Sequence, residues 1–351
     1  MNITFFIGNG FDINLGYATK YSDFYPYYFD YMKKNHSDDL LYKEIKKDKE
    51  NWSDLEMGLG DFHKNIYDGD DAAFIECKNR MDSVLSSYLQ AEAKRNVVFT
   101  GDAAQEFQNR IVHIDQFLPE SDALEYRRAT ESVADTIHYC FISFNYTHSL
   151  DEIIQYTRKN VKQFATHRGG GSIYTDDIVD PIHIHGRTSG EMILGVNDVT
   201  QMSKDENVSD ELRLAMVKPE INDSLGNRNN AKVQKFIDES KYIVVYGMSL
   251  GLTDLKWWKS IFEWLKKDLS RKLVIFHRSK EGTVPSGGET AQRKYNERKK
   301  FFAKVGANQE EFEKHRRQVI VQINSPVFDF KKIQAEKKGK VSNGEQEDAS
   351  V

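Results

Sequence analysis

The sequence predicts an α/β protein with a doubly wound, mostly parallel, Rossmann-like sheet that carries a helical insertion. Short apolar runs alternate along the chain with segments of helical spacing, which is the pattern of β-α-β units. The runs at 3–7, 242–246 and 273–276 are almost continuously apolar, as expected for strands that helices cover on both faces. A mainly helical stretch from 52 to 135 interrupts the alternation and predicts the insertion.

The individual elements follow from the same periodicities. Strands are expected at 3–7, 139–144, 181–185, 242–246, 273–276 and 319–323. Helices are expected between them at 149–158, 230–240 and 255–269. The last helix has the clearest pattern, because Trp258, Phe262 and Leu265 recur at helical spacing.

The chain is expected to divide into a core, an insertion and a tail. Residues 1–50 and 136–330 are expected to form the nucleotide-binding core, and residues 51–135 the helical insertion. The segment 197–230 is polar and poor in periodic apolar residues, which suits a lid. Residues 331–351 are charged and low in apolar content, so we expect a disordered tail.

The composition narrows the class of protein. Hydrophobic residues make up 39% and charged residues 29% of the 351 residues, which suits one large or two modest globular domains. A net charge of -5 argues against non-specific nucleic-acid binding as the main activity. Cys77 and Cys140 have no metal-binding spacing and fit a reduced compartment. We expect a cytoplasmic protein, because we find no signal peptide and no apolar run near the roughly 18 residues of a membrane span.

Polar clusters follow four of the expected strands. They lie at 8–12, 144–147, 183–186 and 247–250. In a doubly wound sheet, ligands bind beyond the carboxyl ends of the strands, near the switch in strand order. We therefore expect the four clusters to meet at one edge of the sheet and to form a ligand site.

The first cluster is a glycine turn. Gly8 and Gly10 permit a sharp turn, and their N–H groups, with that of Asn9, suit a phosphate. A plain tight turn explains the same pattern. Asp12 would repel a diphosphate, so we expect it to accept hydrogen bonds from a ribose hydroxyl or from its own loop.

The second and third clusters supply the expected catalytic residues. Asn145 is either a turn-forming residue or an amide that orients a water or a sugar hydroxyl. His185 is the candidate for proton transfer, because imidazole titrates near neutral pH. His183 and His185 share one face of a strand, which would also suit zinc, and His183 is equally explained as a buried, hydrogen-bonded histidine. The sequence around them has no recognisable metal spacing, so no metal is expected.

The fourth cluster is expected to contact a nucleotide. Gly247 and Ser249 would touch the ribose or a phosphate through their backbone. Asp254 lies near the start of the next helix and is included in this nucleotide-binding set. It or Thr253 would also serve as the cap of that helix.

Five motifs together resemble the AbiH family of bacterial phage abortive-infection proteins. In chain order they are GNGFDINLGYATKYSDF (8–24), NWSDLE (51–56), SFNYTHSLDE (143–152), HIHG (183–186) with ILGVND (193–198), and VVYGMSLGLTD (244–254). The similarity covers roughly residues 3–280. It implies a role in anti-phage defence that limits growth of the infected cell.

More distantly, the order of these motifs resembles the sirtuin-like NAD-binding fold. That resemblance implies Gly8 and Gly10 as loop glycines, Asn145 as the ribose-side asparagine, His185 as the catalytic histidine, and Gly247 and Ser249 as the late turn. Three positions depart from the sirtuin-like pattern. Asp12 stands where that pattern has serine, Asn9 where it has alanine, and Thr147 where many defence NADases have aspartate.

Three functions follow as hypotheses. The leading one is a hydrolase that cleaves the nicotinamide–ribose bond of NAD, in which Asn145 orients the water and His185 accepts a proton. The second is a non-catalytic nucleotide sensor whose insertion binds a phage or host protein. The third is a nuclease or RNA-directed toxin in which Glu56, Asp12 and Asp198 hold Mg²⁺, although their spacing shows no two-metal pattern. An aromatic content of 12% also indicates a possible homo-oligomer.

Overall fold

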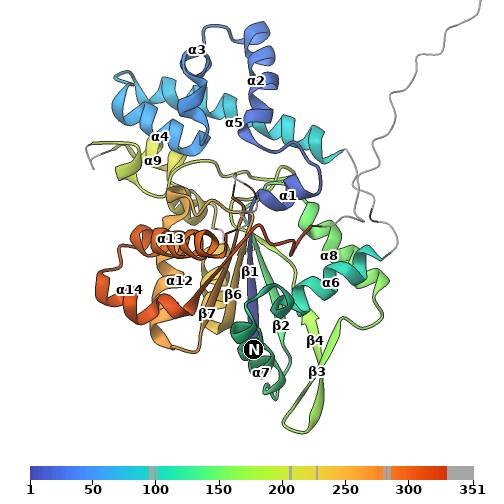
Figure 1. The fold of residues 1–351 in the computed structure, drawn as a ribbon. Helices are drawn as coiled ribbons and strands as arrows, with labels where there is room; N and C mark the ends of the chain where they lie inside the picture. Colours follow the sequence, from blue (N-terminus) through green and yellow to red (C-terminus); the bar gives the residue numbers. More distant parts are fainter. Residues whose placement is uncertain are drawn as a thin grey trace, which may run out of the picture.

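A computed structural model describes residues 1–94, 99, 102–204, 208–226, 228–279, 282 and 286–329 (Figure 1). The expected tail at 331–351 lies outside these described residues. Within them, the chain forms one mixed sheet of eight strands with helices around it.

The sheet has the strand order β3-β4-β2-β1-β6-β7-β8, and the short β5 also pairs with β2. Its strands are β1 (Asn2–Ile7), β2 (His138–Ser143), β3 (Ala165–Gly169), β4 (Ser172–Ile178), β5 (Ile182–His183), β6 (Ser240–Tyr246), β7 (Lys272–His277) and β8 (Val319–Ile323). Every pairing is parallel except that of β3 with β4. The α/β class and the mostly parallel sheet are therefore confirmed, whereas the Rossmann-like relationship stays a prediction.

The β3–β4 hairpin was not expected from the sequence. Its side chains are mostly exposed or half-buried, and Ile173 is 67% exposed. An apolar run is absent from these two strands because they extend beyond the core, as Figure 1 shows at the lower right. The six strands expected from apolar runs are all present, although β5 is only two residues long.

One long run of helices lies between β1 and β2, and the later helices alternate with the remaining strands. The helices are α1 (Gly10–Asn14), α2 (Tyr21–Asn35), α3 (Leu40–Lys47), η1 (Lys49–Trp52), α4 (Leu55–Asn65), α5 (Asp71–Ala93), α6 (Ala103–Val112), η2 (Ile114–Phe117), α7 (Glu120–Glu131), α8 (Ser149–Asn160), η3 (Val199–Gln201), α9 (Asp210–Met216), α10 (Lys218–Ser224), α11 (Asn229–Glu239), η4 (Leu252–Asp254), α12 (Leu255–Lys267), α13 (Gly287–Val305), α14 (Gln309–His315) and η5 (Arg316–Gln318). The three helices expected from their spacing correspond to α8, α11 and α12.

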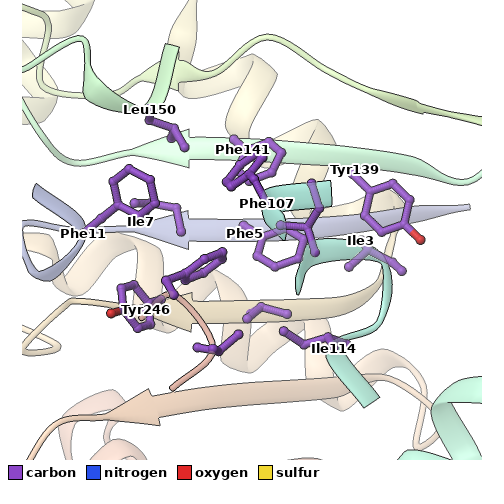
Figure 2. Close-up of a cluster of buried hydrophobic side chains, with 14 of the residues drawn as sticks. Ile3, Phe5, Ile7, Phe11, Phe107, Ile114, Tyr139, Phe141, Leu150 and Tyr246 are labelled. Atoms are coloured by element: carbon purple, nitrogen blue, oxygen red, sulfur yellow. The ribbon is translucent and has the colours of Figure 1, made fainter. Parts of the chain in front are cut away.

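Alternate side chains of the strands build two cores, one on each face of the sheet. On one face, Phe5 of β1 and Phe141 of β2 stack with ring centroids 5.1 Å apart, and Phe107 of α6 packs against them (Figure 2). On the other face, Phe6 of β1 packs against Trp258 of α12. Because successive strand residues point to opposite faces, burial of both sets requires helices on both sides.

A third core belongs to a helical unit that we define as α2–α5 with 194–217. Its buried residues include Tyr28 of α2, Met81 of α5 and Met216 of α9. Figure 1 shows these helices above the carboxyl ends of the strands. The packing thus divides the chain differently from the expected boundaries. The segment 21–47 joins the helical unit, α6 and α7 cover the sheet, and the expected lid packs into the helical unit through its own buried apolar residues.

Candidate functional site

Two glycine turns meet at the carboxyl ends of β1 and β6. The Gly8 N–H donates to the Tyr246 carbonyl and the Gly10 N–H to the Gly247 carbonyl, both at 2.9 Å. A Cβ on Gly10 would lie 2.5 Å from the Cα of Gly247, so a side chain there would force the two backbones apart. The spacing of the two glycines, which would also suit phosphate binding, is therefore explained by the contact between the two turns.

This contact corrects the role expected for Gly8 and Gly10. Their N–H groups are already engaged by carbonyl oxygens, so neither is free to bind a diphosphate in this conformation. Asn9, between them, uses its side chain to hold the following loop. Its Nδ2 donates to the Thr19 carbonyl at 2.9 Å, and its Oδ1 accepts from the Thr19 hydroxyl at 2.5 Å.

Asp12 is a buried carboxyl group that joins the ends of β1 and β2. Its side chain, 1% exposed, accepts a 2.7 Å hydrogen bond from the Thr147 hydroxyl and another from the Ser149 hydroxyl. Burial raises the pKa of Asp12 to about 6, and the bonds from Ser149 and Thr147 limit that rise. A pKa in this range makes Asp12 a proton acceptor suited to neutral pH. The sequence-based expectation that Asp12 serves its own loop is replaced by these bonds to the turn after β2.

Asn145 lies beside Asp12 in that turn. Its backbone N–H is held by the Ser143 hydroxyl at 3.2 Å. Its side-chain nitrogen and oxygen are both buried, and neither has a hydrogen-bond partner among the described residues. The amide lies against the Asp12 carboxyl and lowers its pKa through a weak side-chain hydrogen bond whose geometry falls outside the usual limits. Since an unpaired buried amide costs on the order of 1–3 kcal/mol, Asn145 is a candidate for a ligand contact.

A cavity of about 120 Å³ lies at these two residues. Its walls come from the ends of β1 and β2 and from the helical unit, and are formed by Asn9, Asp12, Thr19, Tyr21, Leu85, Leu89, Phe144, Asn145, Tyr146 and Thr147. Leu85 and Leu89 belong to α5, so the helical unit closes the side opposite the sheet. The cavity suits one ring or one sugar, because cavities of about 150 Å³ take a molecule the size of benzene. A wider hollow of about 290 Å³ lies at α6 and β3, and its walls include no residue predicted for the site.

His183 is fully bonded behind Asn145. Its Nδ1 lies 3.0 Å from the Asn145 carbonyl oxygen, and its Nε2 lies 2.8 Å from the Asp151 carboxylate. Arg187 donates to the other oxygen of Asp151 at 2.7 Å. Of the two explanations offered by the sequence, the structure shows the buried, hydrogen-bonded histidine.

His185 occupies a different place from His183. Its Nε2 lies 2.9 Å from Asp254 Oδ1, an ion-pair distance, although the ring N–H does not point along that line. The ring packs against Phe144 with centroids 5.3 Å apart. Phe144 lines the cavity, whereas His185 and Asp254 line a separate void of about 10 Å³. The structure therefore does not bring His185 to the cavity that holds Asn145.

Asp254 belongs to a buried charge cluster that the sequence did not reveal. The Lys218 ammonium lies 2.9 Å from both Asp254 Oδ1 and Glu56 Oε2. Burial alone would raise the pKa of Asp254, but the charges of Lys218 and His185 lower it far below its usual range. The same pairing raises the pKa of Lys218 against the effect of burial. Asp254 makes no cap bond to α12, and Asn197 instead accepts from the N–H of Lys256 at 2.9 Å.

The remaining predicted residues lie at the edge of this arrangement. Gly247 takes a positive φ of 70° where its turn contacts Gly10, and Ser249 is exposed. Within the described ranges, no group of three or more histidine, cysteine or acidic side chains is arranged to hold a metal ion. None of the described helices is long and apolar enough to cross a membrane.

Lys218, Asp151 and Ser149 are residues of the candidate site and its surroundings that the sequence analysis missed. Lys218 lies in the polar segment that suited a lid, and no local pattern links it to Glu56, which is 162 positions away. For Ser149 and Asp151, the sequence indicated only that they lie in the first turn of a helix. Their partners come from other elements, so pairing could not be inferred from spacing.

Fold and site together define an α/β protein with a buried polar site at the carboxyl edge of a parallel sheet, closed by a helical unit. The family model described as bacteriophage abortive infection AbiH matches residues 4–276. The chain therefore belongs to the AbiH family, which indicates a role in abortive-infection defence against phage, and the family resemblance of its motifs is confirmed. A comparison with curated proteins gave no significant match. The sirtuin-like resemblance stays a prediction.

Proposed function

We propose that this AbiH-family protein is a nucleotide-binding hydrolase that cleaves the bond between nicotinamide and ribose in NAD during phage infection. The observation that carries the proposal is the buried, unpartnered amide of Asn145 in a cavity beside Asp12. An amide can donate to one ligand atom and accept from another, so it suits a ribose hydroxyl or an attacking water.

The cavity would take the reacting end of the nucleotide. Tyr21, Phe144 and Tyr146 provide aromatic walls for a planar ring, and its volume fits nicotinamide or ribose and excludes a whole dinucleotide. The diphosphate would therefore lie outside the cavity. This placement also agrees with the buried negative charge of Asp12, which would repel phosphate.

Asp12 and Asn145 supply the chemistry in this proposal. Water, oriented by the Asn145 amide, forms a bond to the anomeric carbon as the carbon–nitrogen bond breaks and its electron pair leaves with nicotinamide. The developing positive charge on the sugar is stabilised by the Asp12 carboxylate, which then accepts the proton of the water. Asp12 takes the role expected for His185, because Phe144 separates His185 from the cavity.

The test is nicotinamide release from NAD by purified protein, with and without phage lysate as a trigger. Wild type is compared with Asn145→Ala and Asp12→Asn, and Asn160→Ala, an exposed change at the end of α8, is the matched control. We expect both cavity variants to lose at least 100-fold in rate, as is usual for loss of an acid–base group or a positioned polar group. Equal turnover by wild type and the cavity variants would refute the proposal.

A second candidate, the non-catalytic sensor, is favoured by one observation. The helical unit forms part of the cavity wall through Leu85 and Leu89, so a nucleotide bound there would alter its packing. Calorimetric binding of NAD without release of nicotinamide would identify this function. Among the described residues, no contact favours the nuclease hypothesis. Glu56 pairs with Lys218, Asp12 with Thr147 and Ser149, and Asp198 accepts from the Thr200 N–H.

A further inference from the structure

His183 has two hydrogen-bond partners that can only accept. The first, 3.0 Å from Nδ1, is the backbone carbonyl oxygen of Asn145. The second, 2.8 Å from Nε2, is a carboxylate oxygen of Asp151. A carbonyl has no proton to donate, and neither does an ionised carboxylate. Both ring nitrogens must then carry hydrogen.

Asp151 is held in its ionised form by its surroundings. Burial would raise the pKa of Asp151, but the hydrogen bond from His183 and the charges of His183 and Arg187 lower it below its usual value. Arg187 donates to Oδ1 while His183 bonds Oδ2, so each oxygen has a cationic partner or donor. Because Arg187 bonds the other oxygen of Asp151 whatever the state of His183, it favours the ionised carboxylate, which can only accept from His183.

We propose that His183 is a buried imidazolium that positions Asn145 at the cavity and stabilises the ionised form of Asp12. The first part follows from its two acceptors. The positioning role follows from the location of the ring, since His183 bonds the backbone carbonyl of Asn145, whose side chain lies beside Asp12. His183 is 5% exposed, so water screens its charge little.

Charged groups of both signs surround His183 in this state. His183 and Arg187 carry two positive charges, and Asp151 and Asp12 carry two negative charges. Two further titratable groups face the cluster from α8 and its start. Burial lowers the pKa of His148, which keeps that ring neutral, and burial with the nearby Asp151 and Asp12 charges raises the pKa of Glu152. Burial is the largest influence on the pKa of Asp12 and raises it, whereas a positive charge on His183 would lower it.

His183 is thus a positioning residue, and its charge should be measurable without any substrate. The importance for catalysis rests on the proposed function, whereas the protonation state does not. In protein labelled with ¹⁵N at histidine, long-range ¹H–¹⁵N correlation spectra distinguish an imidazolium, with two similar protonated nitrogens, from a neutral ring, with one protonated and one bare nitrogen. The signals of His183 are assigned by their loss in His183→Gln.

We expect the imidazolium pattern for His183 at neutral pH. A neutral ring would overturn the proposal, even if the protein cleaves NAD. Conversely, an imidazolium in a protein that does not cleave NAD would leave the proposal standing and refute only the hydrolase.

The coupling to Asp12 is tested through the titration of its ¹³C-labelled carboxyl group. His183→Gln keeps a donor but removes the charge, so the Asp12 midpoint should shift upward, and His183→Lys should restore part of the shift. His138→Gln is the matched control, because His138 pairs with Asp177 at the amino end of β2. An unchanged Asp12 midpoint in folded His183→Gln would overturn the coupling, while the spectra of the wild type still decide the protonation state.

Discussion

Thr147 donates a 2.7 Å hydrogen bond to the carboxylate of Asp12, and this bond joins the turn after β2 to the helix after β1. The two residues are 135 positions apart. Their contact is possible because β1 and β2 are parallel neighbours whose carboxyl ends lie at one edge of the sheet.

The stability of the protein should depend on pH through Asp12. Because burial raises the pKa of Asp12 from 3.8 to about 6, the folded state binds a proton that the unfolded state has released over this interval. The free energy of unfolding should therefore fall as pH rises from 3.8 to about 6, by about 3 kcal/mol in all. Denaturant unfolding of wild type and Asp12→Asn across this range measures the effect. A constant difference between the two proteins would contradict the prediction.

Lys218→Met should destabilise the fold strongly. It leaves the Glu56 and Asp254 carboxylates buried without their cation, and breaking a buried ion pair in this way costs about 3–5 kcal/mol. Lys34→Met is the matched control. Lys34 pairs with Asp30 on the surface, so its loss should cost less than about 1 kcal/mol. Similar unfolding midpoints in denaturant for the two variants would show that the buried cluster contributes little.

Gly10→Ala should disrupt the contact between the two glycine turns. The new Cβ would lie 2.5 Å from the Cα of Gly247, and backbone must move to relieve that overlap. We expect a loss of about 2–4 kcal/mol, measured by denaturant unfolding. Gly251→Ala tests the same change where the nearest described atom is 3.5 Å away, and it should be tolerated. Equal effects would indicate that the turns separate easily.

Filling the cavity should block nucleotide binding. In Leu85→Trp the larger side chain enters the space beside Asn145, so the Kd for NAD measured by calorimetry should rise at least tenfold. Leu124→Trp adds the same bulk on α7, where the leucine is 42% exposed, and should leave the Kd unchanged. Thermal unfolding confirms that both variants fold. An unaltered Kd in Leu85→Trp would place the nucleotide elsewhere.

Most strands of the sheet were predictable from the sequence, because burial requires runs of apolar residues. Strands β1, β6 and β7 are covered on both faces, so nearly every residue in them must be apolar. The β3–β4 hairpin has no such requirement and left no apolar run. The AbiH family was also recognisable, since its motifs are short and occur in a set order.

The candidate site was only partly predictable. The positions of Asp12 and Asn145 at strand ends followed from the α/β pattern, and both line the cavity. The role of Gly8 and Gly10 could not be predicted, because two glycines at this spacing suit phosphate binding and a close backbone contact equally well. Which of the two roles they take depends on the turn after β6, which lies opposite them.

The sequence by itself determined the α/β class, the strands covered on both faces and the family. Tertiary structure alone decided which polar groups meet. Two histidines of one HIHG motif acquired different partners, His183 with Asp151 and His185 with Asp254, although they are two residues apart. The physical reason is that apolar burial is a property of each residue's own position, whereas a hydrogen bond or an ion pair requires a partner that another part of the chain supplies.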